Sequence, residues 1–120
     1  MEQEELNKMA GEYQVVQEQL QSISIQKEQF KMRQVEYKEA LEEAEKASGT
    51  IYKSVGGFFI EVPKADAIKD IKDKQEFTEM RLKSIEKQYS ELTAKEKDMR
   101  AKLSSAIGEA QNGQAAVHGE

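Results

Sequence analysis

Few side chains in this sequence have the types and spacing that enzyme chemistry requires. Glu42, Glu43 and Glu45 form the densest group of carboxylates, which could act as general acids or bases only inside a pocket that shifts a carboxyl pKa. The Gly56–Gly57 pair lacks the Lys-Ser/Thr and the helix that follow the glycines of a phosphate-binding loop. His118 is the only histidine and lies near the carboxyl end. We therefore predict no catalytic, cofactor-binding or metal-ligating residue and no enzymatic activity.

The composition predicts an elongated protein that does not bind polyanions. Of the 120 residues, 34% are charged and 38% are hydrophobic, which is lean for a compact sphere with its own core. The formal net charge of -5 repels phosphate backbones and anionic membranes, and Lys and Arg form no long basic block. Nucleic acid and membranes are therefore not expected as partners.

The amino-terminal segment and the cysteine count predict a cytoplasmic protein. The chain contains no cysteine, so it can form neither a disulfide nor a thiolate metal site. The segment Met1 to Leu6 is acidic and Gln-rich, unlike the basic and then apolar order of a secretion signal. The longest apolar stretch, around Phe58 to Ile60, is far shorter than the roughly 20 residues that cross a bilayer.

Apolar residues recur at alternating spacings of three and four along both flanks of the chain, which is the pattern of a coiled-coil seam. The polar exceptions are Lys27 and Gln34 in the first run and Gln75, Thr78 and Glu96 in the second. Lys27 and Glu96 face apolar residues, so we expect both side chains to extend outward to solvent. The first run is Leu6, Met9, Tyr13, Val16, Leu20, Ile23, Lys27, Phe30, Gln34, Tyr37, Leu41 and Ala44. The second run is Ile68, Ile71, Gln75, Thr78, Leu82, Ile85, Tyr89, Leu92, Glu96, Met99, Leu103 and Ala106.

The two runs have equal length, which is what an antiparallel pair of helices within one chain requires. We predict helices at residues 2–48 and 64–110, with Phe30 opposite Leu82 in the seam. The small residues at 114–120 have nothing to pack against, so we expect a disordered tail there.

Residues 50–62 predict a β-hairpin between the helices. Gly56–Gly57 is a two-residue turn signal because both glycines can take a positive φ. One face of this hairpin is apolar except for Lys53, and an isolated hairpin of this kind is marginal in water. The apolar residues of this face are Ile51, Val55, Phe58, Ile60 and Val62. Equivalent hairpins from other chains would cover that face by closing a barrel, so we predict oligomerisation through the hairpin.

The centre of the chain also carries its most specific motifs, Tyr52-Lys53-x-Val55-Gly56 and Phe58-Phe-Ile-Glu-Val62. With a heptad helix on either side, these residues resemble the beta class of prefoldin subunits, and the single hairpin is similar to that class and not to the alpha class. The resemblance implies a mainly α fold, in which a long antiparallel two-helix coiled coil is joined by a β-hairpin that forms an intersubunit β-barrel. The prefoldin beta-type domain would occupy residues 1–113.

The resemblance also implies a function, partners and site residues. Prefoldin is expected to be a hexamer of two alpha and four beta subunits that captures unfolded proteins without nucleotide or cofactor and delivers them to a group II chaperonin. The oligomerisation residues would be Ile51, Tyr52, Val55, Gly56, Gly57, Phe58, Phe59, Ile60 and Val62. The client-binding residues, at the distal tips of the coiled coil, would be Leu6, Met9, Tyr13, Val16, Met99, Leu103 and Ile107.

Two other interpretations of the sequence remain open. The chain could be a structural coiled-coil spacer that binds no client, or an adaptor subunit of a prefoldin-like complex. A spacer gains nothing from an apolar sheet face in mid-chain, whereas a chaperone that assembles through a barrel depends on one. The hairpin therefore separates the chaperone from the spacer, and the adaptor hypothesis stays open.

Overall fold

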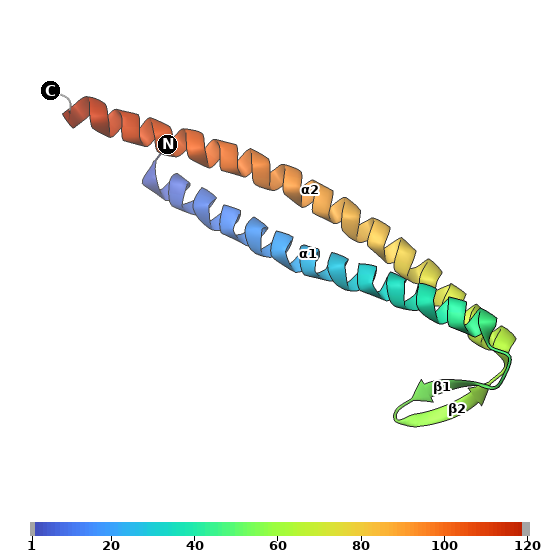
Figure 1. The fold of residues 1–120 in the computed structure, drawn as a ribbon. Helices are drawn as coiled ribbons and strands as arrows, with labels where there is room; N and C mark the ends of the chain where they lie inside the picture. Colours follow the sequence, from blue (N-terminus) through green and yellow to red (C-terminus); the bar gives the residue numbers. More distant parts are fainter. Residues whose placement is uncertain (1, 119–120) are drawn as a thin grey trace. The chain divides into compact units, whose positions relative to one another are not determined.

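The computed structural model describes residues 2–118, and it describes the side chains of residues 2–109. The chain forms helix α1 (Gln3–Lys46), strands β1 (Ile51–Val55) and β2 (Phe58–Val62), and helix α2 (Lys64–His118) (Figure 1). The prediction of a mainly helical fold with a hairpin between two long helices is confirmed. Neither helix, within the described residues, has an apolar stretch that could cross a lipid bilayer.

The chain divides into two compact units, each of which contains part of α1 and part of α2. One unit consists of residues 1–25 and 87–120, and the other of residues 26–86. In the first unit the hydroxyl of Tyr13 in α1 donates a hydrogen bond of 2.8 Å to Glu96 in α2. The second unit contains the hairpin and the helix ends on either side of it.

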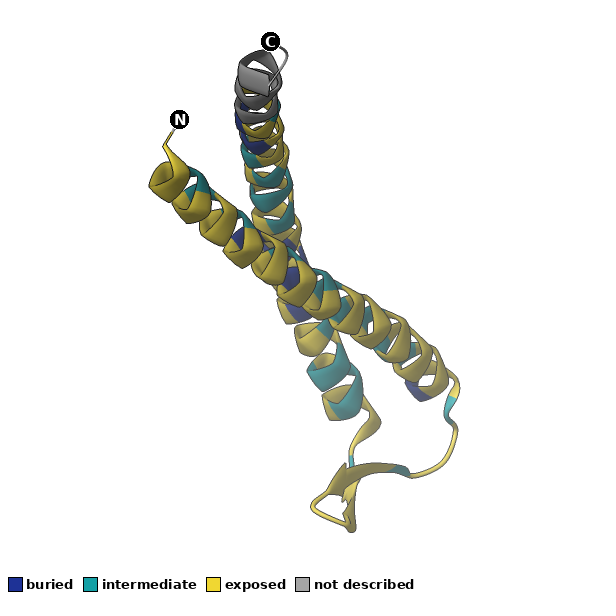
Figure 2. Ribbon diagram, turned by 90° about the vertical axis from the view of Figure 1, so that its left-hand side faces the viewer, coloured by how far each residue is buried: buried dark blue, intermediate teal, exposed yellow. Residues whose placement is uncertain are grey.

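The helical core is the predicted seam. Every residue of the two heptad runs is buried or half-buried, and Figure 2 shows these positions recurring between exposed ones along each helix. The fully buried members are Val16, Ile23, Ala44, Thr78, Leu82, Ile85, Leu103 and Ala106. Burial of this narrow stripe is the main stabilising term for such helices, because most outward-facing residues are polar and remain in water.

The hairpin has the predicted turn and register. Strands β1 and β2 pair antiparallel, with Ile51 opposite Val62 and Val55 opposite Phe58. Gly56 and Gly57 have φ angles of 54° and 86°, a region that L side chains rarely adopt. Glycine at both positions therefore allows the tight connection that the strand pattern requires.

Helix α2 begins at Lys64 as predicted, whereas the end of α1 and the carboxyl end of α2 differ from the prediction. Helix α1 ends at Lys46, not at residue 48, and the Nζ of Lys64 donates to the carbonyls of Glu45 (2.7 Å) and Ala47 (3.0 Å) at this end. These bonds satisfy carbonyls that have no partner within a helix.

Helix α2 continues to His118, whereas the sequence predicted its end at residue 110. Ala and Gln are strong helix formers, and they make up much of residues 110–116, which outweighs the single glycine at 113. The tail expected at 114–120 is thus helical in its backbone to residue 118, and residues 119–120 lie outside the described residues.

Candidate functional site

The hairpin exposes large apolar side chains on both of its faces. Phe58 and Phe59, which point to opposite faces, are 75% and 77% exposed. Tyr52, Val55 and Ile60 are exposed as well. Exposed apolar side chains in a cluster are typical of a surface that another protein covers.

The ends of the hairpin are less exposed than its tip. Ile51 and Val62, the paired residues next to the helices, are half-buried. They help to line a groove of about 570 Å³ whose other apolar walls are Ala44 of α1 and Ala67 and Ile71 of α2. The hairpin thus continues an apolar surface that begins at the helix ends.

One carboxylate connects the hairpin to α2. Asp70 lies 3.8 Å from the Nζ of Lys53 in β1 and 3.1 Å from the Nζ of Lys74 one turn further along α2. The hydrogen bond from Lys74, together with the charges of Lys74 and Lys53, holds the pKa of Asp70 below its ordinary value. The ionised form of Asp70 is therefore favoured. It pairs with Lys53, the one charged residue on the apolar face of the hairpin.

The unit of residues 1–25 and 87–120 contains a second groove. Ala10 and Tyr13 of α1 and Leu103 and Ile107 of α2 line this groove, which has a volume of about 630 Å³. Arg100 adds a positive charge at its edge. A wide apolar groove without a dense set of polar groups can accept side chains of varied shape.

A polar pair lies beside this groove. The Tyr13 hydroxyl donates to Glu96, and the Nε of Arg100 lies 3.7 Å from the same carboxylate. The hydrogen bond to Glu96, with some desolvation and the negative charge of Glu96, raises the pKa of Tyr13 above its ordinary value. The protonated tyrosine is therefore held as the donor.

The expectation that Glu96 extends outward to solvent was wrong. Its side chain is only 15% exposed and is held by Tyr13 and Arg100. A buried carboxylate is retained in an apolar seam when it has hydrogen-bond and charge partners, and Tyr13 provides the first of these. The sequence contained a signal for this pair, since Tyr was the one seam residue of that region with a hydroxyl to donate.

The structure places the predicted client-binding residues in three environments. Val16 and Leu103 are buried, with 2% and 8% of their surface exposed. Ile107 is 44% exposed. The remaining members, Leu6, Met9, Tyr13 and Met99, are half-buried. In the single chain these residues therefore mainly close the seam, and Ile107 presents the most apolar surface.

Some exposed apolar residues lie outside both predicted sites. From the sequence we expect them to broaden the packing or to line a cavity between coiled coils and not to form a defined site, since scattered exposed apolar residues are normal on protein surfaces. They are Val15, Ile25, Met32, Val35, Phe77 and Met80, and each is more than half exposed.

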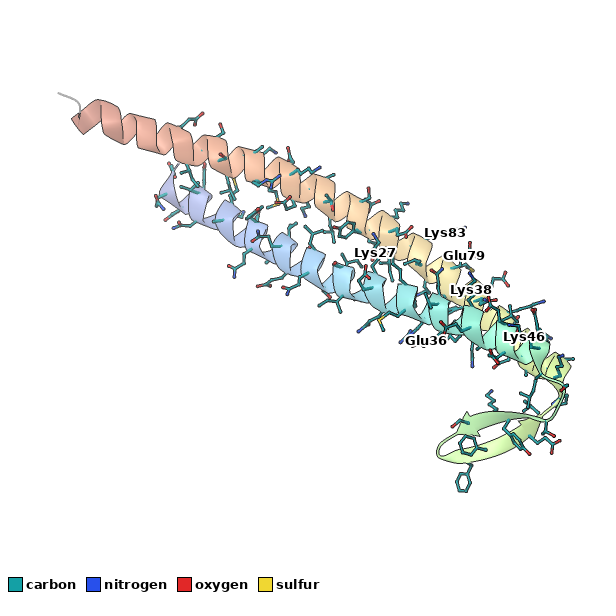
Figure 3. All side chains as sticks on the ribbon, in the orientation of Figure 1. Lys27, Glu36, Lys38, Lys46, Glu79 and Lys83 are labelled. Carbon is teal, nitrogen blue, oxygen red and sulfur yellow. The ribbon has the colours of Figure 1, made fainter. Side chains whose placement is uncertain are left out.

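Charged residues on the exposed faces of α1 and α2 form a solvated surface. Glu36 and Lys38 on α1 and Glu79 and Lys83 on α2 are exposed, as Figure 3 shows. The Nζ of Lys83 lies 3.5 Å from Glu79, which is a surface ion pair of small energetic value. Within the described residues no group of three or more His, Asp or Glu side chains is arranged to hold a metal ion.

The model of one protein family, described as prefoldin subunit, matches residues 7–110. The chain belongs to the prefoldin family. The beta subunit of prefoldin from Thermococcus onnurineus is 39% identical over 101 residues, which cover 82% of this chain and 87% of the relative. The beta subunit from Methanosarcina acetivorans is 33% identical over 106 residues, which cover 87% of this chain and 91% of the relative.

A solved structure agrees with these relatives. The crystal structure of the prefoldin beta subunit from Thermococcus strain KS-1 matches with a TM-score of 0.76 at 33% identity, over 85% of this chain and 91% of that one. The resemblance read from the sequence is thereby confirmed. As a member of the prefoldin family, the chain is a chaperone subunit that assembles with other prefoldin subunits.

Proposed function

We propose that this prefoldin subunit works in the cytoplasm in a hexamer of two alpha and four beta subunits, captures unfolded proteins at the free ends of its helices without ATP, and delivers them to a group II chaperonin. The observation that carries the proposal is the exposed apolar hairpin. A chain that worked alone would gain no stability from Phe58 and Phe59 in water, whereas an assembled chain gains it by burying them.

The hairpin residues are the proposed assembly surface. Val55, Phe58 and Ile60 share one face with the half-buried pair Ile51 and Val62, so a neighbouring hairpin can extend an apolar layer that already begins at the helices. Open strand edges favour addition of further strands, and closure of the strands into a barrel removes those edges. The apolar hairpin also speaks against the spacer hypothesis, because a spacer has no use for it.

The groove beside Tyr13 is the proposed client surface. Unfolded chains present apolar segments of no fixed sequence, and the groove offers apolar walls from Ala10, Leu103 and Ile107. Met9 and Met99, which are half-buried nearby in the sequence, add side chains that adapt to varied shapes. Each such groove would bind weakly, but several in one assembly raise the effective concentration and thus the avidity.

The assembly surface is tested by Phe58→Ser combined with Ile60→Ser. These exchanges make two of the five apolar residues of the hairpin face polar and leave the seam unchanged. We therefore expect full helicity by circular dichroism but loss of the hexamer in native mass spectrometry with a co-expressed alpha-class subunit. Val15→Ser combined with Ile25→Ser is the matched control, since both residues are exposed on α1 outside the hairpin. A hexamer of unchanged mass in the hairpin variant would contradict assembly through the hairpin.

The client surface is tested by removing residues 1–16 and 96–120. The deletion removes both partners of the Tyr13–Glu96 bond and every residue that lines the groove, while the hairpin remains. We expect the shortened subunit to assemble but to lose most of its suppression of client aggregation, measured by light scattering with and without ATP. Equal protection by the shortened hexamer would move the client surface elsewhere, and protection that required ATP in the absence of chaperonin would contradict the nucleotide-free mechanism.

A further inference from the structure

Two guanidinium groups, one from each helix, lie against the ring of Phe30. The Cζ of Arg33 in α1 is 5.1 Å from the ring centroid, and the Cζ of Arg81 in α2 is 5.9 Å from it. Both distances are within the range of a cation–π interaction. All three residues belong to the unit of residues 26–86. Phe30 is half-buried, whereas Arg33 and Arg81 are exposed.

Neither guanidinium is neutralised by the part of the chain that the structure describes. The ion pairs among residues 2–109 involve other cations, and the two arginines take part in none of them. The arginine nitrogens also make no hydrogen bond to a described residue. Two like charges beside one ring repel each other, and an arriving carboxylate would relieve that repulsion while accepting their free N–H donors.

A small hollow lies beside Phe30 and Arg33. It has a volume of about 240 Å³, and its walls include Phe30, Arg33, Tyr37 and Phe77. Phe77 is 62% exposed, so its ring is accessible to a partner. A hollow of this size fits one large side chain.

The residues one helical turn before and one turn after Phe77 carry opposite charges. Arg81 lies one helical turn after Phe77, and Asp73, which also lines the hollow, lies one turn before it. Lys74 lines the hollow too, but its ammonium is paired with Asp70 at 3.1 Å. A carboxylate is therefore repelled at the Asp73 end and attracted at the end of Arg33 and Arg81.

We propose that Phe30, Arg33, Phe77 and Arg81, here called the arginine–phenylalanine site, bind segments of unfolded protein in which a carboxylate adjoins a large apolar side chain. The apolar side chain enters the hollow against Phe77, and the carboxylate accepts hydrogen bonds from the arginines. The inference rests on the proposed function of client capture, and it adds selectivity for acidic and apolar segments at a place in the sequence far from the helix ends.

The test compares three peptides that carry the same neutral fluorophore. The first has the sequence Gly-Ser-Phe-Asp-Phe-Asp-Gly-Ser, and the other two have Asn or Lys in place of Asp. Their binding to the full-length, assembled protein is measured by fluorescence anisotropy. We expect the Asp peptide to bind about tenfold more tightly than the Asn peptide, as a charge-assisted hydrogen bond would provide, and the Lys peptide to bind most weakly.

Arg33→Gln combined with Arg81→Gln should abolish the preference for the Asp peptide. Lys38→Gln combined with Lys72→Gln is the matched control, because it removes one exposed cation from each helix at heptad positions on the other side of the seam. All four exchanges concern exposed residues, and circular dichroism checks that helicity is retained. The control should keep the preference for the Asp peptide.

Two results would overturn the inference: a preference for the Asp peptide that survives in the arginine variant, or one that disappears equally in the lysine control, which would indicate net charge alone. The proposed function has a separate readout, the suppression of aggregation of a whole unfolded client. If the wild-type assembly fails in that assay, client capture is contradicted. The preference for the Asp peptide over the Asn peptide separately tests whether the arginine–phenylalanine site binds acidic and apolar segments.

Discussion

The hairpin and the helical seam use apolar side chains in opposite ways. Along the seam, residues such as Val16 and Ile85 are 2% and 3% exposed, and their burial is complete within one chain. In the hairpin, Phe58 and Phe59 are about three-quarters exposed although the strands pair fully. The difference follows from geometry, since two long helices can cover one stripe on each other, whereas a two-stranded sheet has no second layer. The seam therefore stabilises the single chain, and the hairpin is left for partners.

The strongest test of this comparison is Ile85→Ala against Ile25→Ala. Ile85 is buried in the seam, so its truncation leaves a cavity and should lower the free energy of unfolding by about 2–5 kcal/mol. Ile25 in α1 is 53% exposed, and its truncation should change the free energy of unfolding by less than about 0.5 kcal/mol. Urea unfolding followed by circular dichroism gives both values. Equal losses would show that the seam is not where the helices gain their stability.

A glycine exchange should have opposite signs in the two regions. At Gly57, φ is 86°, so alanine would be strained by roughly 1–2 kcal/mol although no neighbouring atom obstructs its Cβ. Gly57→Ala should therefore lower the temperature at which the assembly dissociates. At Gly11, within α1, alanine meets no atom and should stabilise the helix by about 1 kcal/mol. Thermal scans at one fixed protein concentration compare the two variants, and a shift in the same direction for both would contradict this account.

The polar pair in the seam should show its contribution at alkaline pH. The pKa of Tyr13 is raised above its ordinary value of 10.0 in the folded protein, so its stabilising effect is fully present below about pH 10 and is lost as the pH rises through the raised pKa. Tyr13→Phe should thus be less stable than the wild type near neutral pH, and the difference should shrink above about pH 10. Urea unfolding of both proteins across this range measures it. A difference that does not depend on pH would mean that packing, and not the bond to Glu96, sets the effect.

The smallest expected effect belongs to the ion pairs of the hairpin. The pKa of Asp70 is held below its ordinary value of 3.8, so the stabilising effect of its charge is present above that pH and is lost as the pH falls through the lowered pKa. Asp70→Asn should slightly destabilise the protein at neutral pH and should equal the wild type in strong acid. Because the pairs with Lys53 and Lys74 are exposed, salt should weaken the effect as well. Asp98→Asn, which breaks the exposed pair with Lys102, is the control for a pair that does not involve the hairpin.

The periodic features of this protein could be predicted from its amino-acid pattern. Among residues 2–109, whose side chains the structure describes, the three-and-four spacing identified every buried residue of the helices, because burial on a helix recurs with the period of the helix. The Gly56–Gly57 pair and the strand pattern determined the hairpin and its register, because few residues other than glycine accept the φ angles of this turn. The motifs at Tyr52 and Phe58 were sufficient to indicate the family.

The pairs of side chains that meet across the helices could not be predicted from the sequence. Glu96 accepts a bond from Tyr13, Lys64 caps the end of α1, and Arg33 and Arg81 converge on Phe30. Each of these contacts depends on the offset and rotation of one helix against the other, and a heptad pattern specifies the facing stripe without specifying the rotamers of the residues at its edges. The heptad pattern also could not predict that α2 continues to His118, because alanine and glutamine favour a helix without any periodic apolar signal.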